Sequence, residues 1–149
     1  MREQRLTLTI ESRLEDVPLL GTLVNALCCF VKLSATARNQ VEVCVVEAVN
    51  NSIQHAYHGE AGHLVEVAVS LPPESLVFDI FDSGTSADPS AMHADHCGAL
   101  KLSLDQPQAI AESGRGLAIM QAFMDSMEYT AGVAGKHRNQ FRLTKRRQE

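Results

Sequence analysis

The sequence of 149 residues lacks several features that would assign it to particular classes of protein. No window approaches the ~18 consecutive apolar residues of a membrane-spanning helix, and residues 1–4 do not open a signal peptide. The formal net charge is -5, so the excess of basic residues typical of nucleic-acid-binding proteins is missing. We therefore expect a cytoplasmic protein that has neither a membrane nor a nucleic acid as its partner.

Cysteine spacings typical of zinc sites or disulfide frameworks are also missing. None of the four cysteines has a Cys-x-x-Cys spacing, which argues against a zinc knuckle and against a disulfide framework. What is present is ordinary for a soluble globular protein: 45% hydrophobic and 21% charged residues. A chain of this length can bury a sizeable core, so we expect one compact domain over residues 1–149.

The periodicity of apolar residues predicts five strands and three helices. Strands are expected at residues 4–10, 63–71, 75–81, 127–131 and 139–144, the first as an edge strand with Leu6, Leu8 and Ile10 toward the core. Helices are expected at residues 18–33, at 35–57 after the N-cap Ser34, and from Gly114 through Met127. The order β-α-α-β-β-loop-α-β-β predicts an α+β protein: a two-layer α/β sandwich with a mostly antiparallel sheet covered on one face by three helices.

The long segment at residues 83–113 has no strong period. A loop of this length in a compact domain is usually functional or mobile, and we interpret it as a lid with one helical turn near residues 99–104. His93, Asp95, His96 and Cys97 lie in it, but their spacing matches no standard zinc site.

Polar residues stand four apart in the second half of the second helix. Because an α-helix advances about 100° per residue, Glu47, Asn51 and His55 share one face. Val45, Val49 and other apolar residues between them can anchor the helix on the core. The helix would then present a carboxylate, a carboxamide and an imidazole, although a Glu and an Asn four apart usually form an ordinary solvated pair.

Two further polar segments follow this helix in the sequence. Asp82-Ser83-Gly84 ends a strand, and Ser113-Gly114-Arg115-Gly116-Leu117 begins a helix. Each alone is a weak signal. Together with Glu47 and Asn51, and in this order, they resemble the N, G1 and G2 boxes of the GHKL (histidine-kinase-like) ATPases, which implies the Bergerat ATP-binding fold.

Three longer stretches of sequence narrow the resemblance to the bacterial anti-sigma factor serine kinases. The matching stretches are residues 47–57, 116–125 and 142–145. The resemblance implies that the cofactors are ATP and Mg²⁺. It also implies a homodimer that sequesters a sigma factor or similar target and phosphorylates a serine of a STAS-type antagonist, the anti-anti-sigma protein.

Roles for single residues follow from the resemblance. It implies that Glu47 is the catalytic general base, that Asn51 holds magnesium, and that Asp82 accepts a hydrogen bond from the adenine amino group. It further implies that the glycine segment binds phosphates at the helix start and that His55 supports the pocket. The remaining residues expected to contact the nucleotide are Gly84, Ser113, Gly114, Arg115, Gly116 and Leu117.

The chain departs from the family at three points, and two other functions stay open. Ser86 stands where many relatives have a second glycine, residues 135–139 replace a Gly-Thr pair, and Glu112 stands where some relatives have arginine. The first alternative is a non-catalytic ATP-binding module that switches partners without phosphoryl transfer. The second is the detached catalytic domain of a histidine kinase.

Overall fold

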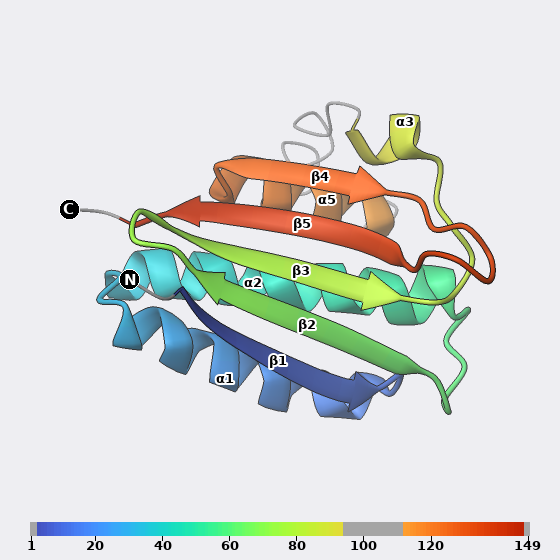
Figure 1. Cartoon of the computed structure of the whole chain (residues 1–149), viewed down its shortest axis with the longest axis horizontal. Coiled ribbons are helices and arrows are strands. Elements are labelled where there is room, and N and C mark those ends of the chain that lie inside the picture. Colours follow the sequence, from blue (N-terminus) through green and yellow to red (C-terminus); the bar gives the residue numbers. More distant parts are fainter. Residues whose placement is uncertain (1–2, 94–111, 148–149) are drawn as a thin grey trace.

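A computed structural model shows two layers, with a twisted sheet in one and helices in the other (Figure 1). It describes residues 3–93 and 112–147, and only the backbone of residues 112–114. No helix in these residues has the length and hydropathy needed to cross a bilayer.

The sheet has five strands, and every pair in it is antiparallel. Its order is β1-β2-β3-β5-β4, which leaves β1 and β4 at the edges (Figure 1). The predicted strands and the edge position of the first one are confirmed. Their bounds are β1 Gln4–Glu11, β2 Leu64–Leu71, β3 Ser75–Asp82, β4 Ser126–Thr130 and β5 Asn139–Arg146.

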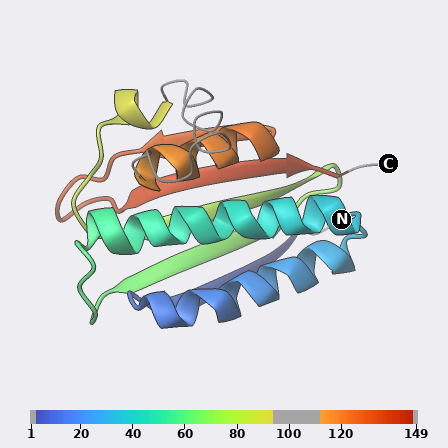
Figure 2. The same ribbon diagram turned by 180° about the vertical axis from the view of Figure 1, so that it is seen from behind.

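Three longer helices cover one face of the sheet, as expected. They are α1 (Val17–Phe30), α2 (Ala35–Asn51) and α5 (Glu112–Phe123), with α2 lying between the other two (Figure 2). The hydroxyl of Ser34 accepts a hydrogen bond from the backbone N–H of Ala37 at 3.2 Å, which confirms the predicted N-cap. Within residues 3–93 and 112–147, no helix covers the opposite face of the sheet.

The first helix and the first strand bury less apolar surface than their sequences suggest. The buried stripe of α1 consists of Val17, Leu20, Val24 and Cys28, whereas Leu19 and Phe30 are 65% and 67% exposed. The sequence of an apolar helix does not determine which of its sides packs against the rest of the protein. In α1 only one narrow stripe does so. Leu6, expected in the core, is also exposed.

The pairing of β3 with β5 determines what lies near the end of the sheet. Along both strands the side chains alternate between the helix-covered face and the open face. Asp82 on the covered side is the register partner of Asn139, and Asp79 on the open side is that of Arg142. The two pairs therefore lie on opposite faces of the same strand pair.

The segment after β3 forms a short helix, α3 (Pro89–His93), beyond the end of β4 (Figure 1). The helical turn predicted near residues 99–104 lies outside the described residues, as do Asp95, His96 and Cys97.

Candidate functional site

A cavity of about 390 Å³ opens where α2 ends, beside the loop that follows β3. This volume is in the range of roughly 300–1,000 Å³ that is usual for small-molecule sites. Its walls come from five regions that are distant in sequence. The lining residues are Ala48, Asn51, Ser52, His55, Ala56, Asp82, Thr85, Ser86, Ala87, Ala91, Met92, Leu117, Tyr129 and Phe141.

The helix wall of the cavity changes its winding at the site. The predicted single helix at residues 35–57 is instead α2, ending at Asn51, followed by one π-helical segment, η2 (Ser52–Ala56). The backbone N–H of Tyr57 donates to the carbonyl of Ser52 at 3.0 Å, closing the wide turn. Such segments are rare and frequent at functional sites. Here Asn51, Ser52, His55 and Ala56 all reach the cavity wall.

The predicted carboxylate Glu47 lies one turn before Asn51 and meets the start of α5. A Cβ added at Gly116 would lie 2.8 Å from Oε2 of Glu47, so only glycine leaves that carboxylate in place. The structure thus brings the helix stripe and the second glycine segment together. Glu47 is half-buried at this contact.

The glycine segment itself lies differently from the prediction. We expected the helix to begin at Gly114, but α5 begins at Glu112, so Gly114, Arg115 and Gly116 belong to its first turns. Glycine in a helix costs only about 1 kcal/mol relative to alanine, and the close approach of Glu47 to Gly116 explains why it stands there. Arg115 is exposed, and the side chain of Ser113 lies outside the described atoms.

The loop after β3 is held against η2. The backbone N–H of Thr85 donates to the carbonyl of Ala56 at 2.9 Å. A Cβ added at Gly84 would collide with that same backbone carbonyl. The missing side chain of Gly84 thus lets the loop pack on η2, while the expected contact of Gly84 with a nucleotide stays a prediction.

Asp82 is the buried acidic residue of the cavity. It is 6% exposed, and its Oδ1 accepts hydrogen bonds from the backbone N–H of Gly84 at 3.0 Å and from Nδ2 of Asn139 at 2.7 Å. None of the described residues donates to its second oxygen, Oδ2. Because a carboxylate can accept about four hydrogen bonds, Asp82 keeps acceptor capacity for a ligand.

Asn139 is the main site residue that sequence reasoning missed. It is 2% exposed and contacts Asp82 and the loop that follows it. A signal was present in the sequence: Asn139 takes the core-facing register of β5 together with Phe141 and Leu143, where an amide needs buried partners.

Two tyrosines tie neighbouring loops to the site. Tyr57 donates its hydroxyl to the carbonyl of Leu64 at 2.7 Å and accepts from the N–H of Ser83 at 2.8 Å. The hydroxyl of Tyr129 accepts from the N–H of Ala87 at 2.9 Å. Burial raises the pKa of both hydroxyls, so they remain protonated at neutral pH.

The predicted site residues therefore converge. Asn51, His55, Asp82 and Leu117 line the cavity, while Glu47, Gly84 and Gly116 adjoin it through the contacts above. Among the described residues no cluster of three or more His, Cys, Asp and Glu side chains could hold a metal alone. The carboxamide oxygen of Asn51 suits a magnesium ion that keeps most of its waters and shares oxygen ligands with a bound phosphate.

Comparison with known proteins gives a consistent result. Residues 10–145 match the model of the histidine kinase-like ATPase domain family. The anti-sigma F factor of Clostridium beijerinckii is 24% identical over 128 residues, which cover 86% of this chain and 85% of that protein.

Two proteins called serine-protein kinase RsbW are also similar to this chain. The one from Bacillus pumilus is 36% identical over 93 residues, which cover 61% of this chain and 56% of that protein. The one from Listeria innocua is 25% identical over 132 residues, covering 87% of this chain and 83% of that protein.

Proposed function

Because this chain belongs to the histidine kinase-like ATPase domain family, we propose that it is an ATP-dependent serine protein kinase that also acts as an anti-sigma factor. The observation that carries the proposal is the convergence of Asn51, Asp82 and Leu117 on one cavity, with Glu47 held beside Gly116. The names of the similar proteins, anti-sigma F factor and serine-protein kinase, support both parts of it.

The adenine end of the site would be Asp82. Its Oδ2, to which none of the described residues donates, can accept a hydrogen bond from the exocyclic amino group of adenine, while Gly84 and Thr85 fix the loop on η2. The apolar side chains of Met92, Leu117 and Phe141 line the same cavity and can bury the purine ring. The residues present therefore fit an adenine nucleotide.

The phosphate end would lie toward Asn51 and the start of α5. Magnesium bound with ATP would supply charge neutralisation for phosphoryl transfer. Asn51 would contribute its neutral oxygen, and the N-terminal N–H groups of α5 would face the phosphates. Ser113, Gly114 and Arg115 stay candidates for this contact.

Glu47 would act as general base. A substrate serine would lose its hydroxyl proton to the Glu47 carboxylate while its oxygen bonds to the γ-phosphorus, and ADP would leave. The contact with Gly116 restricts where this carboxylate can move. We propose that the acceptor serine belongs to a STAS-type anti-anti-sigma protein and that the sequestered partner is a sigma factor or similar target, in the cytoplasm.

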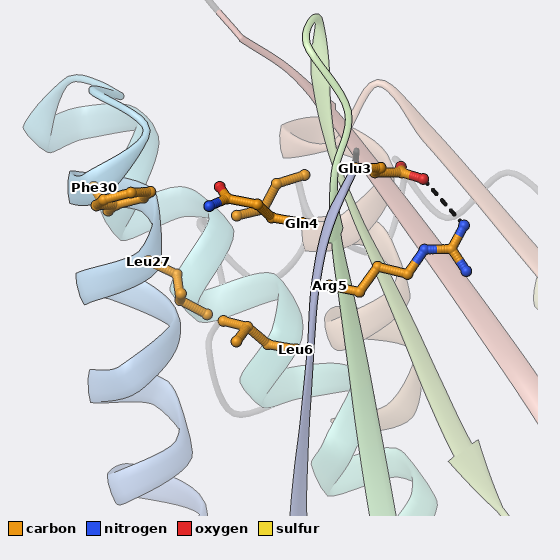
Figure 3. A pocket seen from close by; sticks show the side chains of 7 residues that line it. Glu3, Gln4, Arg5, Leu6, Leu27 and Phe30 are labelled. Atoms are coloured by element: carbon orange, nitrogen blue, oxygen red, sulfur yellow. Dashed lines mark hydrogen bonds and ion pairs between the residues drawn. The ribbon is translucent and has the colours of Figure 1, made fainter. Parts of the chain in front are cut away.

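We also propose a homodimer formed through the β1 edge and α1. β1 pairs with β2 on one side only, and a groove of about 980 Å³ separates its start from α1. Figure 3 shows Leu6, Leu27 and Phe30 around this groove, which Glu3 and Arg5 also line, paired with each other at 3.0 Å. An unpaired edge beside exposed apolar side chains favours association with a second copy.

Transfer of labelled phosphate tests the kinase. The chain is incubated with γ-labelled ATP, magnesium and a STAS-domain protein from the same organism, or with the serine-to-alanine variant of that protein. We expect label only on the serine form, and its loss in Glu47→Ala and Asn51→Ala. The matched controls are Glu42→Ala and Asn39→Ala, which remove the same groups from the part of α2 that bonds to Asn25 of α1.

The outcomes separate the candidate functions. ATP binding without serine-dependent label would leave a non-catalytic, partner-switching module. Transfer that persists in both Glu47→Ala and Asn51→Ala would remove the assigned roles. If calorimetry of the folded protein with magnesium detects no adenine nucleotide even at millimolar concentration, the whole proposal is wrong.

A further inference from the structure

The buried amide of Asn139 occupies an unusual position for a polar side chain. It stands at the start of β5, in the register that Phe141 and Leu143 use to face the core, and it is 2% exposed. Burying an amide without partners would cost several kcal/mol. Its hydrogen bonds therefore reveal what holds it there.

All four hydrogen-bonding positions of the amide are used. The oxygen Oδ1 accepts from the backbone N–H of Gly132 at 2.7 Å and from the hydroxyl of Ser86 at 2.7 Å. The nitrogen Nδ2 donates to the carbonyl of Gly84 at 3.0 Å and to Oδ1 of Asp82 at 2.7 Å. Two donors and two acceptors are the full capacity of an asparagine side chain.

These partners also fix which way the amide points. The N–H of Gly132 can only donate, and the carbonyl of Gly84 can only accept, so a flipped amide would oppose both. The NH₂ group must face Asp82. Asn139 thus presents a donor to the cavity carboxylate and cannot present an acceptor there.

This arrangement gives the two oxygens of the Asp82 carboxylate different hydrogen-bond partners. Asn139 and the N–H of Gly84 both occupy Oδ1, and none of the described residues donates to Oδ2. The loop that carries Thr85 and Ser86 into the cavity wall is tied to the same amide. The side chain therefore connects the carboxylate, its loop and the turn at Gly132.

We propose that Asn139 is a positioning residue that orients Asp82 toward the exocyclic amino group of adenine and so determines which purine the site accepts. The inference rests on the proposed ATP binding and goes one step beyond it. A carboxylate with one oxygen fixed accepts an amino group well and repels a carbonyl oxygen at the same place. A purine with oxygen at its C6 position is then rejected.

The test compares ATP with inosine triphosphate, which carries an oxo group in place of the adenine amino group. Dissociation constants of both, with magnesium, are measured by calorimetry for the whole chain. We expect the wild-type protein to prefer ATP by at least about tenfold, the value of one well-placed hydrogen bond. In Asn139→Ala and Asn139→Asp we expect this preference to fall to about one- to threefold.

Gln140 supplies a matched control on the other side of the sheet. Its Nε2 donates to Oδ1 of a second carboxylate, Asp79, at 2.9 Å, on the open face. Gln140→Ala removes an amide, as Asn139→Ala does, and Gln140→Glu adds a negative charge, as Asn139→Asp does. Both changes lie next to an aspartate that does not line the cavity. These variants should keep the wild-type preference for ATP.

Each possible result tests either the role of Asn139 or the proposed ATP binding. A purely structural Asn139 would weaken both nucleotides equally and leave their ratio unchanged, which overturns the inference while ATP binding stands. Absence of ATP binding in the wild-type chain overturns the proposed function instead. If Asn139→Ala does not fold, Asn139→Ser decides, because its hydroxyl keeps a polar group at the buried position but is one bond too short to replace Nδ2 at Asp82: a preference below the wild-type value supports the inference, and an unchanged one overturns it.

Discussion

Two buried aspartates on β3 show how the two faces of the sheet differ. Asp79 and Asp82 are three residues apart and almost equally buried, at 7% and 6% exposure. Asp79, on the open face, accepts from Arg142 at 2.7 and 3.2 Å and from Gln140 at 2.9 Å. Asp82, at the cavity, accepts from two neutral donors, the N–H of Gly84 and the amide of Asn139, and no described lysine or arginine forms a salt bridge with it.

Asp79 is therefore a structural carboxylate, whereas Asp82 keeps hydrogen-bond acceptor capacity for a ligand. A buried carboxylate needs partners, and at Asp79 a bidentate guanidinium supplies them. The hydrogen bond to Asp79 is also the main reason why the pKa of Arg142 is raised. At Asp82 a cation would consume the acceptor that an amino group needs, and Asn139 holds the carboxylate without doing so.

The largest expected effect is at the cavity. In Asp82→Asn, the new NH₂ group must point away from the amide of Asn139, so it faces the bound base as a donor. A hydrogen bond to a charged group is worth about 2 kcal/mol, so we expect ATP affinity to fall by roughly 30-fold. Calorimetric titration with magnesium and ATP checks this, and an affinity within twofold of wild type would contradict the role of Asp82.

A smaller effect is expected for the loop that carries this carboxylate. In Gly84→Ala the new Cβ meets the backbone carbonyl of Ala56, which cannot move without shifting η2. We expect a loss of about 1–2 kcal/mol of stability in urea denaturation, together with weaker ATP binding. In Gly116→Ala the Cβ meets only the end of the Glu47 side chain, so this control should lower phosphoryl transfer with little change in stability.

Local sequence patterns predicted much of this arrangement. The order of strands and helices follows from periodicity, and the three polar segments were placed on the elements where the structure has them. Asp82 and Gly84 were predicted at a strand end because a strand followed by Asp-Ser-Gly is a local signal. Asn51, His55, Asp82 and Leu117 line one cavity, and their roles toward a nucleotide stay predictions.

Other features depend on long-range register or on small differences in winding. Asn139 meets Asp82 only because β3 and β5 pair in one register across 57 residues of chain. The π-helical turn at η2 has the same apolar pattern as an α-helix, so periodicity does not distinguish them. The exposure of Leu19 and Phe30 depends on which side of α1 has a partner, and this is not encoded locally.

The next smaller effect is on the open face. Asp79→Asn keeps one acceptor oxygen but loses the charge that pairs with Arg142, whose side chain is about half exposed. We expect a loss of about 1 kcal/mol in the free energy of unfolding, discounted for solvent screening at Arg142. ATP affinity should not change. A fall in affinity as large as that of Asp82→Asn would erase the distinction between the two faces.

The smallest effect concerns the two buried thiols, Cys28 on α1 and Cys44 on α2. Burial raises the pKa of Cys28 and Cys44 from 9.0 to about 12, so both thiols stay neutral in the folded protein. The unfolded chain releases these protons above about pH 9 while the folded chain retains them, so the free energy of unfolding falls as pH rises toward 12. Below pH 9 neither state is ionised and the effect is absent.

Urea denaturation at about pH 8 and about pH 10 measures this loss. We expect the loss to be smaller in Cys28→Ala and in Cys44→Ala than in the wild-type protein, because each variant removes one thiol that ionises only after unfolding. Cys29→Ala is the matched control, since Cys29 is exposed beside Cys28. An equal loss in all four proteins would show that burial does not keep these thiols neutral.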